Sequence, residues 1–180
     1  MQLLRRDASF NILVCTPSNA ASDLLVERLA TAGLTVDQLL RLNARSRDMR
    51  NIPESVRAFS RIPAIPEGEN LPPFHVDLRP LRVVVSTCSS AGLIQYHYPS
   101  ASFSHIVIDE AAQAEEPLAL IPIATFSNEH TNIILAGDPH QLGPVIKSSP
   151  ASEAGLGKSY LERLMLISEV YGLDTQAGKT

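Results

Sequence analysis

The chain contains four short runs of apolar residues, and in three of them the apolar positions are continuous rather than alternating with polar ones. Each run is rich in β-branched residues and is followed directly by small or polar residues. The runs occupy residues 11–15, 81–86, 105–108 and 132–136. Short, bounded and continuous apolar runs are typical of strands that are buried on both faces of a parallel sheet. The pattern therefore predicts four such strands.

The segments between these runs carry the spacing and capping signals of helices. Ser18 or Asn19 is suited to cap a helix whose apolar residues recur at helical spacing, at Ala21, Leu24, Leu25 and Leu29. The sequence Glu115-Glu116-Pro117 has the acids and the proline that the first turn of a helix tolerates. Strands that alternate with helices favour an α/β fold with a parallel sheet.

A further helix is predicted near the end of the chain. Ser159 and Glu162 have the spacing of a capping box, and the helix that they begin would place Leu161, Leu164 and Met165 on one face. Gly172 is the residue at which we expect this helix to stop. Residues 171–180 are expected to form a flexible tail, and residues 1–170 to form the domain.

Prolines interrupt the alternation of strands and helices between the first and second apolar runs. Residues 51–80 hold six of the 13 prolines and have little periodic apolar pattern except around Val56 and Phe59. We expect a partly irregular surface insertion, extending over about residues 45–80. Either a long connecting loop or a shortened accessory subdomain accounts for this composition.

Composition restricts the classes of protein that need to be considered. With 44% hydrophobic residues over 180 positions the chain can build a sizeable core, and a net charge of −4 argues against a histone-like basic protein. The sequence has no signal-peptide pattern and no apolar run long enough to span a membrane, so we expect a cytoplasmic protein without a membrane partner. Two cysteines and five scattered histidines make a zinc site a weak alternative.

Two adjacent acids, Asp109 and Glu110, directly follow the third apolar run. A buried strand that ends in two carboxylates brings both to the carboxyl edge of the sheet, where open α/β folds bind ligands. In nucleoside triphosphatases, one acid of such a pair holds Mg²⁺ and the other orients and deprotonates the attacking water. The plainer interpretation is a strand followed by an acidic helix cap.

The fourth apolar run ends in a second candidate site, with Gly137-Asp138 and then Gln141 three residues further on. A turn here can place the Gln141 amide near a γ-phosphate, where it can both donate and accept hydrogen bonds, and can bring Asp138 toward a metal. The plainer interpretation is an ordinary Asp-Pro turn, which the motif taken alone favours.

Polar corners also follow the first and second apolar runs. The first contains Pro17, Ser18 and Asn19, and the second contains Thr87 and Ser89. Hydroxyls and backbone N–H groups at such corners can bind phosphates, although isolated corners of this kind are more often helix caps. Their expected position at one end of the same sheet strengthens the functional interpretation.

Taken together and in this order, the four motifs resemble those of superfamily one RNA helicases, in the Armitage or silencing-defective branch related to the nonsense-decay helicase. The resemblance extends from about residue 10 to residue 166 and includes residues 12–24, 135–145 and 155–165. It implies most of the first of two RecA-like domains of the P-loop NTPase class, here incomplete because the strand of the phosphate-binding loop is missing. It further implies ATP hydrolysis coupled to movement on single-stranded RNA, with the rest of the helicase core and RNA-silencing proteins as partners.

The same resemblance implies a role for individual residues. Asp109 would hold Mg²⁺ and Glu110 would be the catalytic base, with Gln141 as a third catalytic residue. The nucleotide site would comprise Asp109, Gln113, Gly137, Asp138 and Gln141. The RNA backbone would contact Pro17, Ser18, Asn19, Thr87 and Ser89.

The 180 residues contain no phosphate-binding loop of the form Gly-x-x-x-x-Gly-Lys-Ser/Thr. We therefore expect these residues alone to have little ATPase activity, because the β- and γ-phosphates would lack their main ligands. In the family the strand of that loop lies beside the strand ending at Gly137, so an unpaired apolar edge is expected here. The alternative is a non-catalytic RNA-binding or protein-interaction module, and the reading frame upstream of Met1 distinguishes the two.

Overall fold

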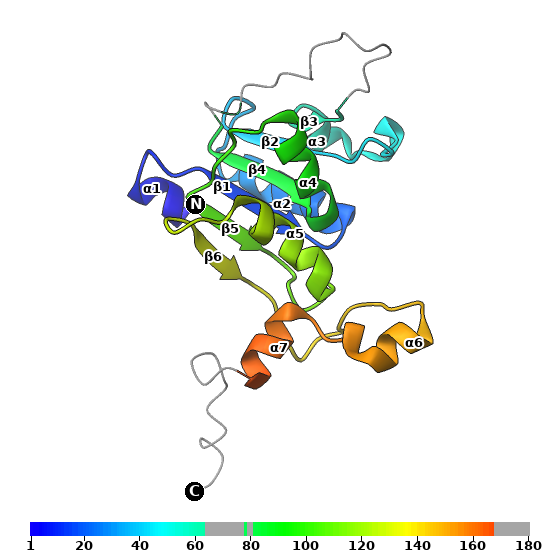
Figure 1. Ribbon diagram of the computed structural model, residues 1–180. Coiled ribbons are helices and arrows are strands. Elements are labelled where there is room, and N and C mark those ends of the chain that lie inside the picture. Colours follow the sequence, from blue (N-terminus) through cyan, green and yellow to red (C-terminus); the bar gives the residue numbers. More distant parts are fainter. Residues whose placement is uncertain (64–77, 79–80, 168–180) are drawn as a thin grey trace, which may run out of the picture.

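The structure is a computed structural model that describes residues 1–63, 78 and 81–167. Its described part contains one six-stranded sheet with strand order β3-β2-β4-β1-β5-β6, in which all paired strands are parallel (Figure 1). The strands are β1 (Ile12–Thr16), β2 (Leu39–Leu42), β3 (Ser60–Arg61), β4 (Val83–Thr87), β5 (His105–Ile108) and β6 (Asn132–Leu135). The predicted α/β fold with a parallel sheet is confirmed.

Helices connect the strands and cover both faces of the sheet. They are α1 (Gln2–Arg6), α2 (Asn19–Thr31), α3 (Glu54–Arg57), α4 (Cys88–His97), α5 (Glu116–Phe126), α6 (Ser149–Ala151) and α7 (Tyr160–Ile167), with short turns at Met49–Asn51 and Ser152–Leu156. Within the described ranges, no helix has the length and apolar content needed to cross a bilayer.

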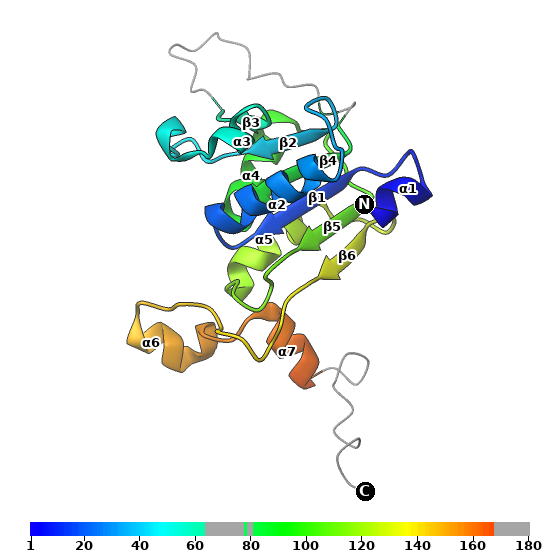
Figure 2. The same ribbon diagram turned by 180° about the vertical axis from the view of Figure 1, so that it is seen from behind.

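Two layers of helices enclose the central strands. Helices α4 and α5 lie on the face seen in Figure 1, and α2 lies on the opposite face, seen in Figure 2. Strand β1 shows why both faces are apolar, because Leu13 and Cys15 belong to the core under α4 and α5, whereas Ile12 and Val14 belong to the core under α2. This burial on both faces explains the continuous apolar runs of the sequence.

The predicted helix starts are confirmed by hydrogen bonds. The hydroxyl of Ser18 accepts a hydrogen bond from the Ala21 N–H at 3.2 Å and so caps α2. The hydroxyl of Ser159 accepts one from the Glu162 N–H at 3.1 Å at the start of α7. Helix α5 follows Glu115 and has a proline in its first turn. The predicted end at Gly172 and the predicted tail at 171–180 lie outside the described residues.

The proline-rich stretch is more ordered at its beginning than predicted. Residues 49–61 form a short turn, helix α3 and strand β3, and the side chains of Ile52 and Val56 are almost completely buried. Strand β3 pairs with β2, and neither strand was predicted. The order at 49–61 includes Val56 and Phe59, the positions at which the sequence has a periodic apolar pattern, so this part of the stretch packs onto the domain. Residues 64–77 and 79–80 of the stretch lie outside the described residues.

Burial differs from the apolar pattern at two other elements. On α2 the buried residues are Ser22, Asp23 and Val26, whereas Leu24 is 47% exposed, so the predicted apolar face is only partly correct. Polar partners deeper in the structure hold the buried serine and aspartate, as described below. Strand β6 was predicted to be buried on both faces, but three of its four residues are exposed.

The exposure of β6 follows from its position at the end of the sheet. Ile133 is 44% exposed and Ile134 is 37% exposed, so the apolar edge predicted beside the strand ending at Gly137 is present. A cavity of about 370 Å³ lies alongside, lined by apolar side chains of β6, α5 and α7, among them Ile133, Leu135 and Leu164. The edge of the sheet at β6 is thus less covered than its centre.

Candidate functional site

The strand register brings all four predicted motifs to one edge of the sheet. Thr16 of β1 is aligned with Thr87 of β4, and Ile108 of β5 is aligned with both Cys15 of β1 and Leu135 of β6. Because the strands are parallel, the residues that follow them lie at the same carboxyl edge. The predicted RNA contacts follow the neighbouring strands β4 and β1, and the predicted nucleotide contacts follow β5 and β6.

The two acids occupy a tight turn directly after β5. The backbone N–H of Asp109 donates to the carbonyl of Cys15 at 2.8 Å, which continues the pairing of β5 with β1. Glu110 has a φ of 56°, and it is the one non-glycine residue of the described chain with a positive φ. Left-handed backbone is uncommon and unfavourable for a glutamate, and residues held in such conformations cluster at active sites and ligand clamps.

Gln113 is connected to Glu110 within this turn. Its side-chain amide nitrogen donates to Glu110 Oε2 at 2.8 Å, and its backbone N–H donates to the Glu110 carbonyl at 2.9 Å. Both side chains are therefore held on one side of the turn, with Glu110 half-buried and Gln113 exposed. The sequence interpretation placed these two residues in one site, and the structure brings them together.

The turn after β6 lies against the turn that carries the acids. The N–H of Ala136 donates to Ile108 O, and the N–H of Ala111 donates to Ala136 O, both at 2.8 Å. A Cβ atom added to Gly137 would lie 3.0 Å from the backbone nitrogens of Ala111 and Ala112. Glycine is therefore favoured at position 137, because a Cβ atom would press on backbone rather than on a flexible side chain.

Asp138 caps its own turn. Its carboxylate accepts hydrogen bonds from the His140 N–H at 2.9 Å and from the Gln141 side-chain amide at 3.3 Å. This agrees with the plainer interpretation, that of an Asp-Pro turn. A cavity of about 450 Å³ is lined by Gln113, His140, Gln141 and Leu142, so the two glutamines of the predicted nucleotide site face one space.

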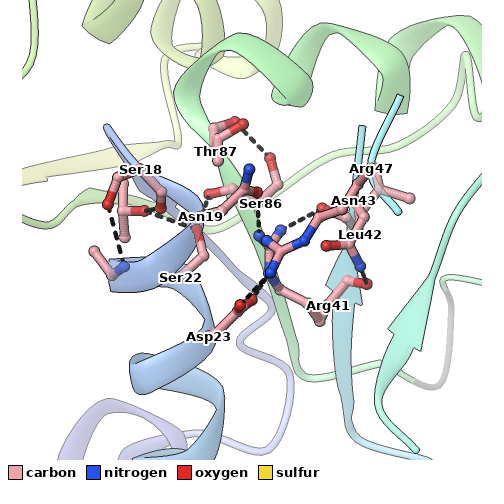
Figure 3. Close-up of polar contacts among 12 residues, drawn as sticks. Ser18, Asn19, Ser22, Asp23, Arg41, Leu42, Asn43, Arg47, Ser86 and Thr87 are labelled. Atoms are coloured by element: carbon pink, nitrogen blue, oxygen red, sulfur yellow. Dashed lines mark hydrogen bonds and ion pairs between the residues drawn. The ribbon is translucent and has the colours of Figure 1, made fainter. Parts of the chain in front are cut away.

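A group of hydroxyls organises the corner that follows β1 (Figure 3). Thr16 Oγ1 lies within hydrogen-bond distance of both the Ser18 carbonyl and Ser22 Oγ, at 2.7 Å from each, and its single hydrogen can be donated to either. Ser22 Oγ in turn donates to the Ser86 carbonyl on β4 at 3.2 Å. Ser18 and Asn19 are exposed, but the hydrogen bonds of these buried groups hold their backbone in place.

The corner that follows β4 presents one exposed residue and one buried residue. Thr87 is 6% exposed, and its hydroxyl accepts from the Ser90 N–H at 3.2 Å and donates to Ser90 Oγ at 2.8 Å. Its hydroxyl therefore caps α4. Ser89 is exposed at the same corner. Of these two predicted RNA contacts, Ser89 is the more accessible to a ligand.

Sequence reasoning did not find a buried ionic network behind the first corner, formed by Asp23, Arg41 and Arg47 and extended to Asn19 (Figure 3). Arg41 is completely buried, and its Nε donates to Asp23 Oδ1 at 3.0 Å. Arg47 Nη2 donates to Asp23 Oδ2 at 2.5 Å. The available signal was a single arginine within the apolar run 39–42.

Burial changes the pKa of several groups near this edge. Burial lowers the pKa of the Arg41 guanidinium, and the hydrogen bond and charge of Asp23 oppose that change. Burial also raises the pKa of the Cys15 thiol, and it raises the pKa of the Cys88 thiol to about 12. Both thiols are therefore neutral at physiological pH and are not suited to act as nucleophiles.

The donor set at the end of β5 fits Mg²⁺. Hard divalent cations prefer oxygen ligands, and Mg²⁺ is commonly held by one or two carboxylates together with substrate phosphates. Asp109 is half-buried at the tip of β5 and next to Glu110, so a carboxylate is available at a partly shielded position. Asp109 is the residue that would hold the ion.

Comparisons with known proteins show which proteins the chain resembles. A family described as an AAA domain matches residues 77–149. The chain is 41% identical to mov-10-B.1 of Danio rerio over 94% of its length and 42% identical to RNA helicase Mov10l1 of Mus musculus over 86%. It is 29% identical to ATP-dependent helicase upf1 of Schizosaccharomyces pombe over 93%. The matched segment covers 17%, 12% and 20% of these proteins, respectively.

The parallel sheet, the position of the acids and these matches define the class: the chain is a P-loop NTPase-type domain. Within that class the chain is similar to the Mov10 and Upf1 relatives, which are superfamily one RNA helicases. The chain spans a fifth or less of the length of these curated relatives.

Proposed function

We propose that this chain is the part of an ATP-dependent RNA helicase that forms one side of the nucleotide site and part of the path of single-stranded RNA. ATP and Mg²⁺ would bind over the ends of β5 and β6, and RNA over the ends of β4 and β1. The resemblance extends the proposal to cytoplasmic RNA silencing, with the rest of the helicase core and silencing proteins as partners.

The observation that carries this proposal is the arrangement of the two groups of residues along one sheet edge. The corner with Ser18 and Asn19 follows β1, which pairs directly with β5, the strand that ends at Asp109. Neighbouring strands lie about 4.8 Å apart. The predicted nucleotide and RNA sites are therefore adjacent, as a motor that couples one ligand to the other requires.

In the nucleotide half, each side chain has a role that its position supports. Mg²⁺, when bound, neutralises phosphate charge, and Asp109 would hold it. Glu110 would accept the proton of the attacking water, and Gln113 donates to its Oε2 and so limits the positions of that carboxylate. Gln141 would contact the γ-phosphate from the turn that Asp138 caps.

In the RNA half, contacts to the backbone are expected to dominate. Ser18, Asn19 and Ser89 are exposed at the edge, beside Pro17 and the buried Thr87. Hydroxyls, amides and helix N-termini are common partners of phosphate oxygens, and such contacts position a nucleic acid without reading its sequence. We expect binding with little sequence preference and with strong dependence on salt.

The test of the nucleotide half uses Asp109→Asn and Glu110→Gln in a longer protein that contains this chain together with a phosphate-binding loop. Each substitution is expected to reduce ATP turnover by at least about 100-fold, because a general base alone contributes 10² to 10⁴ to the rate. RNA affinity should stay within about twofold. Turnover is measured by phosphate release and affinity by fluorescence anisotropy. Retained turnover in either variant refutes the assignment of metal ligand and base.

The 180 residues by themselves provide a second test. Purified alone, the chain is expected to bind single-stranded RNA but to release no phosphate from ATP, because its sequence has no loop to hold the β- and γ-phosphates. RNA-stimulated phosphate release by the chain refutes this expectation. If the chain binds RNA but none of the longer proteins that contain it hydrolyses ATP, the alternative of a non-catalytic RNA-binding module is favoured.

A further inference from the structure

Each of the three guanidinium nitrogens of the buried Arg41 donates a hydrogen bond. Its Nε donates to Asp23 Oδ1 at 3.0 Å, its Nη1 to the Leu42 carbonyl at 2.6 Å, and its Nη2 to Asn19 Oδ1 at 2.8 Å. The first two partners are buried, whereas Asn19 is exposed at the edge of the sheet. The network therefore extends from the interior of the domain to one surface carboxamide (Figure 3).

This contact determines the orientation of the Asn19 carboxamide. A guanidinium can only donate hydrogen bonds, so the atom of Asn19 that faces Arg41 must be its oxygen. The orientation is thus set by chemistry and does not depend on distinguishing oxygen from nitrogen in the coordinates. With its oxygen directed at Arg41, Asn19 has its NH₂ group directed away from the network as a hydrogen-bond donor.

The charge of the network suits an anionic ligand at that position. Arg41 and Arg47 carry two positive charges against the single negative charge of Asp23, so the three residues keep a net positive charge. Arg47 Nη1 is buried and has no hydrogen-bond partner among the described residues. Asn19 is also the first residue of α2, where free N–H groups and the helix dipole favour negative charge.

Stability alone does not explain this arrangement. A buried ion pair contributes little compared with well-packed apolar residues of the same volume, since removing charges from water is costly. Here the side chains of Arg41 in β2, Asp23 in α2 and Arg47 in the loop after β2 are buried together, and the network reaches the surface at Asn19. The neighbouring Ser18 already caps α2, so Asn19 is not needed for that purpose.

We propose that Arg41, itself held by Asp23, is a positioning residue that presents the Asn19 NH₂ group as a hydrogen-bond donor to a phosphate oxygen of single-stranded RNA. The proposal rests on the proposed RNA-binding function of this corner and adds the group that orients its contact residue. Arg41 does not touch the RNA. It acts through Asn19.

The first experiment compares Asn19→Asp with Ala20→Asp in the 180-residue chain. Asn19→Asp keeps an oxygen for Arg41 but removes the donor, whereas Ala20→Asp adds the same charge at the next exposed position. The probe is a fluorescein-labelled 15-nucleotide oligouridylate, with affinity measured by anisotropy. Asn19→Asp is expected to bind about tenfold more weakly than Ala20→Asp, the effect of losing a hydrogen bond to a charged group, without a lower melting temperature.

The second experiment examines the orientation without RNA. The ¹⁵N heteronuclear NOE of the Asn19 side-chain amide reports whether that group is fixed. It is expected to be high in the unaltered chain and low in Arg41→Met, which removes the donor but keeps an unbranched side chain. An unchanged NOE in a folded Arg41→Met variant overturns the proposal. If Arg41→Met does not fold, equal binding by Asn19→Asp and Ala20→Asp still overturns the proposal.

The outcomes separate this inference from the function on which it rests. If the unaltered chain binds the oligouridylate but Asn19→Asp binds no more weakly than Ala20→Asp, the positioning role is refuted and the RNA-binding role of the corner stands. If the unaltered chain does not bind the oligouridylate, the RNA-binding role is refuted and the donor role with it.

Discussion

Single residues at the sheet edge are constrained mainly by the backbone around them. Glu110 adopts a left-handed conformation, and Gly137 lies against the amides that follow it. The two turns therefore meet through backbone atoms, with no side chain between them that could move to absorb a change. At this scale the geometry of the candidate site depends on residues that carry no chemistry of their own, such as Gly137.

Gly137→Ala is predicted to destabilise the domain by about 2 kcal/mol, because its Cβ would lie 3.0 Å from two backbone nitrogens and force the turns apart. The matched control is Gly92→Ala within α4, where the new Cβ would lie 3.7 Å from a side-chain atom of Ile121. The control is predicted to be neutral or stabilising by about 0.5 to 1 kcal/mol. Urea unfolding measures both. Equal stability of the two variants would contradict the close approach.

At the scale of elements, the sequence predicted those strands and helices whose apolar pattern is simple. Strands β1, β4 and β5 are buried on both faces, so their continuous apolar runs are unambiguous. Strand β2 was missed because Arg41 interrupts its run, although the arginine is completely buried. The sequence does not show that Asp23 compensates the charge of Arg41, since the two residues are 18 positions apart.

The buried pair of Arg41 and Asp23 also explains why the buried face of α2 differs from the predicted one. A helix pattern based on apolar residues assigns Leu24 to the core and Asp23 to the surface, but the buried arginine reverses this assignment. The positions of Asp109, Glu110 and Gly137 were predictable because the ends of parallel strands meet at one edge. Hydrogen bonds between side chains far apart in the sequence, such as Arg41 to Asn19, were not predictable.

Val56→Ala tests whether the beginning of the proline-rich stretch belongs to the folded domain. Val56 is completely buried on α3, so removal of two methyl groups is predicted to destabilise the domain by about 2 kcal/mol. Val36→Ala, at a residue that is 49% exposed, is the control with the same chemical change and should have little effect. Thermal or urea unfolding distinguishes the two. A neutral Val56→Ala would show that this part of the surface insertion contributes little to the stability of the domain.

For the whole molecule, the order of the strands divides one edge of the sheet between two predicted ligands. Strand β1 lies between β4 and β5, so it contacts both halves of the edge. Strand β6, in contrast to the central strand β1, lies at the end of the sheet, and its apolar residues are exposed in the described structure. Exposed strand edges can pair with other chains.

The chain alone is therefore predicted to self-associate as its concentration rises, through β6. Ile134→Lys should reduce this association, because a lysine on an edge strand opposes pairing with a second edge. Val145→Lys is the control, since Val145 is 83% exposed but lies outside the strand. Light scattering after size-exclusion chromatography gives the mass at each concentration. A chain that stays monomeric with a cooperative melt would contradict the prediction.

The segment from Asp138 to Lys158 is anchored at both of its ends to the same short stretch of chain. At one end Gly137 lies against Ala111 and Ala112, and at the other end Ser159 forms a bridge with Glu115, next to the ion pair of Glu116 with Arg163. Lengthening a loop whose ends are already closed costs little free energy. An affinity tag or a fluorescent reporter inserted near Lys147, which is exposed and lies before α6, should therefore leave the acids undisturbed, and this makes the segment suitable for labelling the domain.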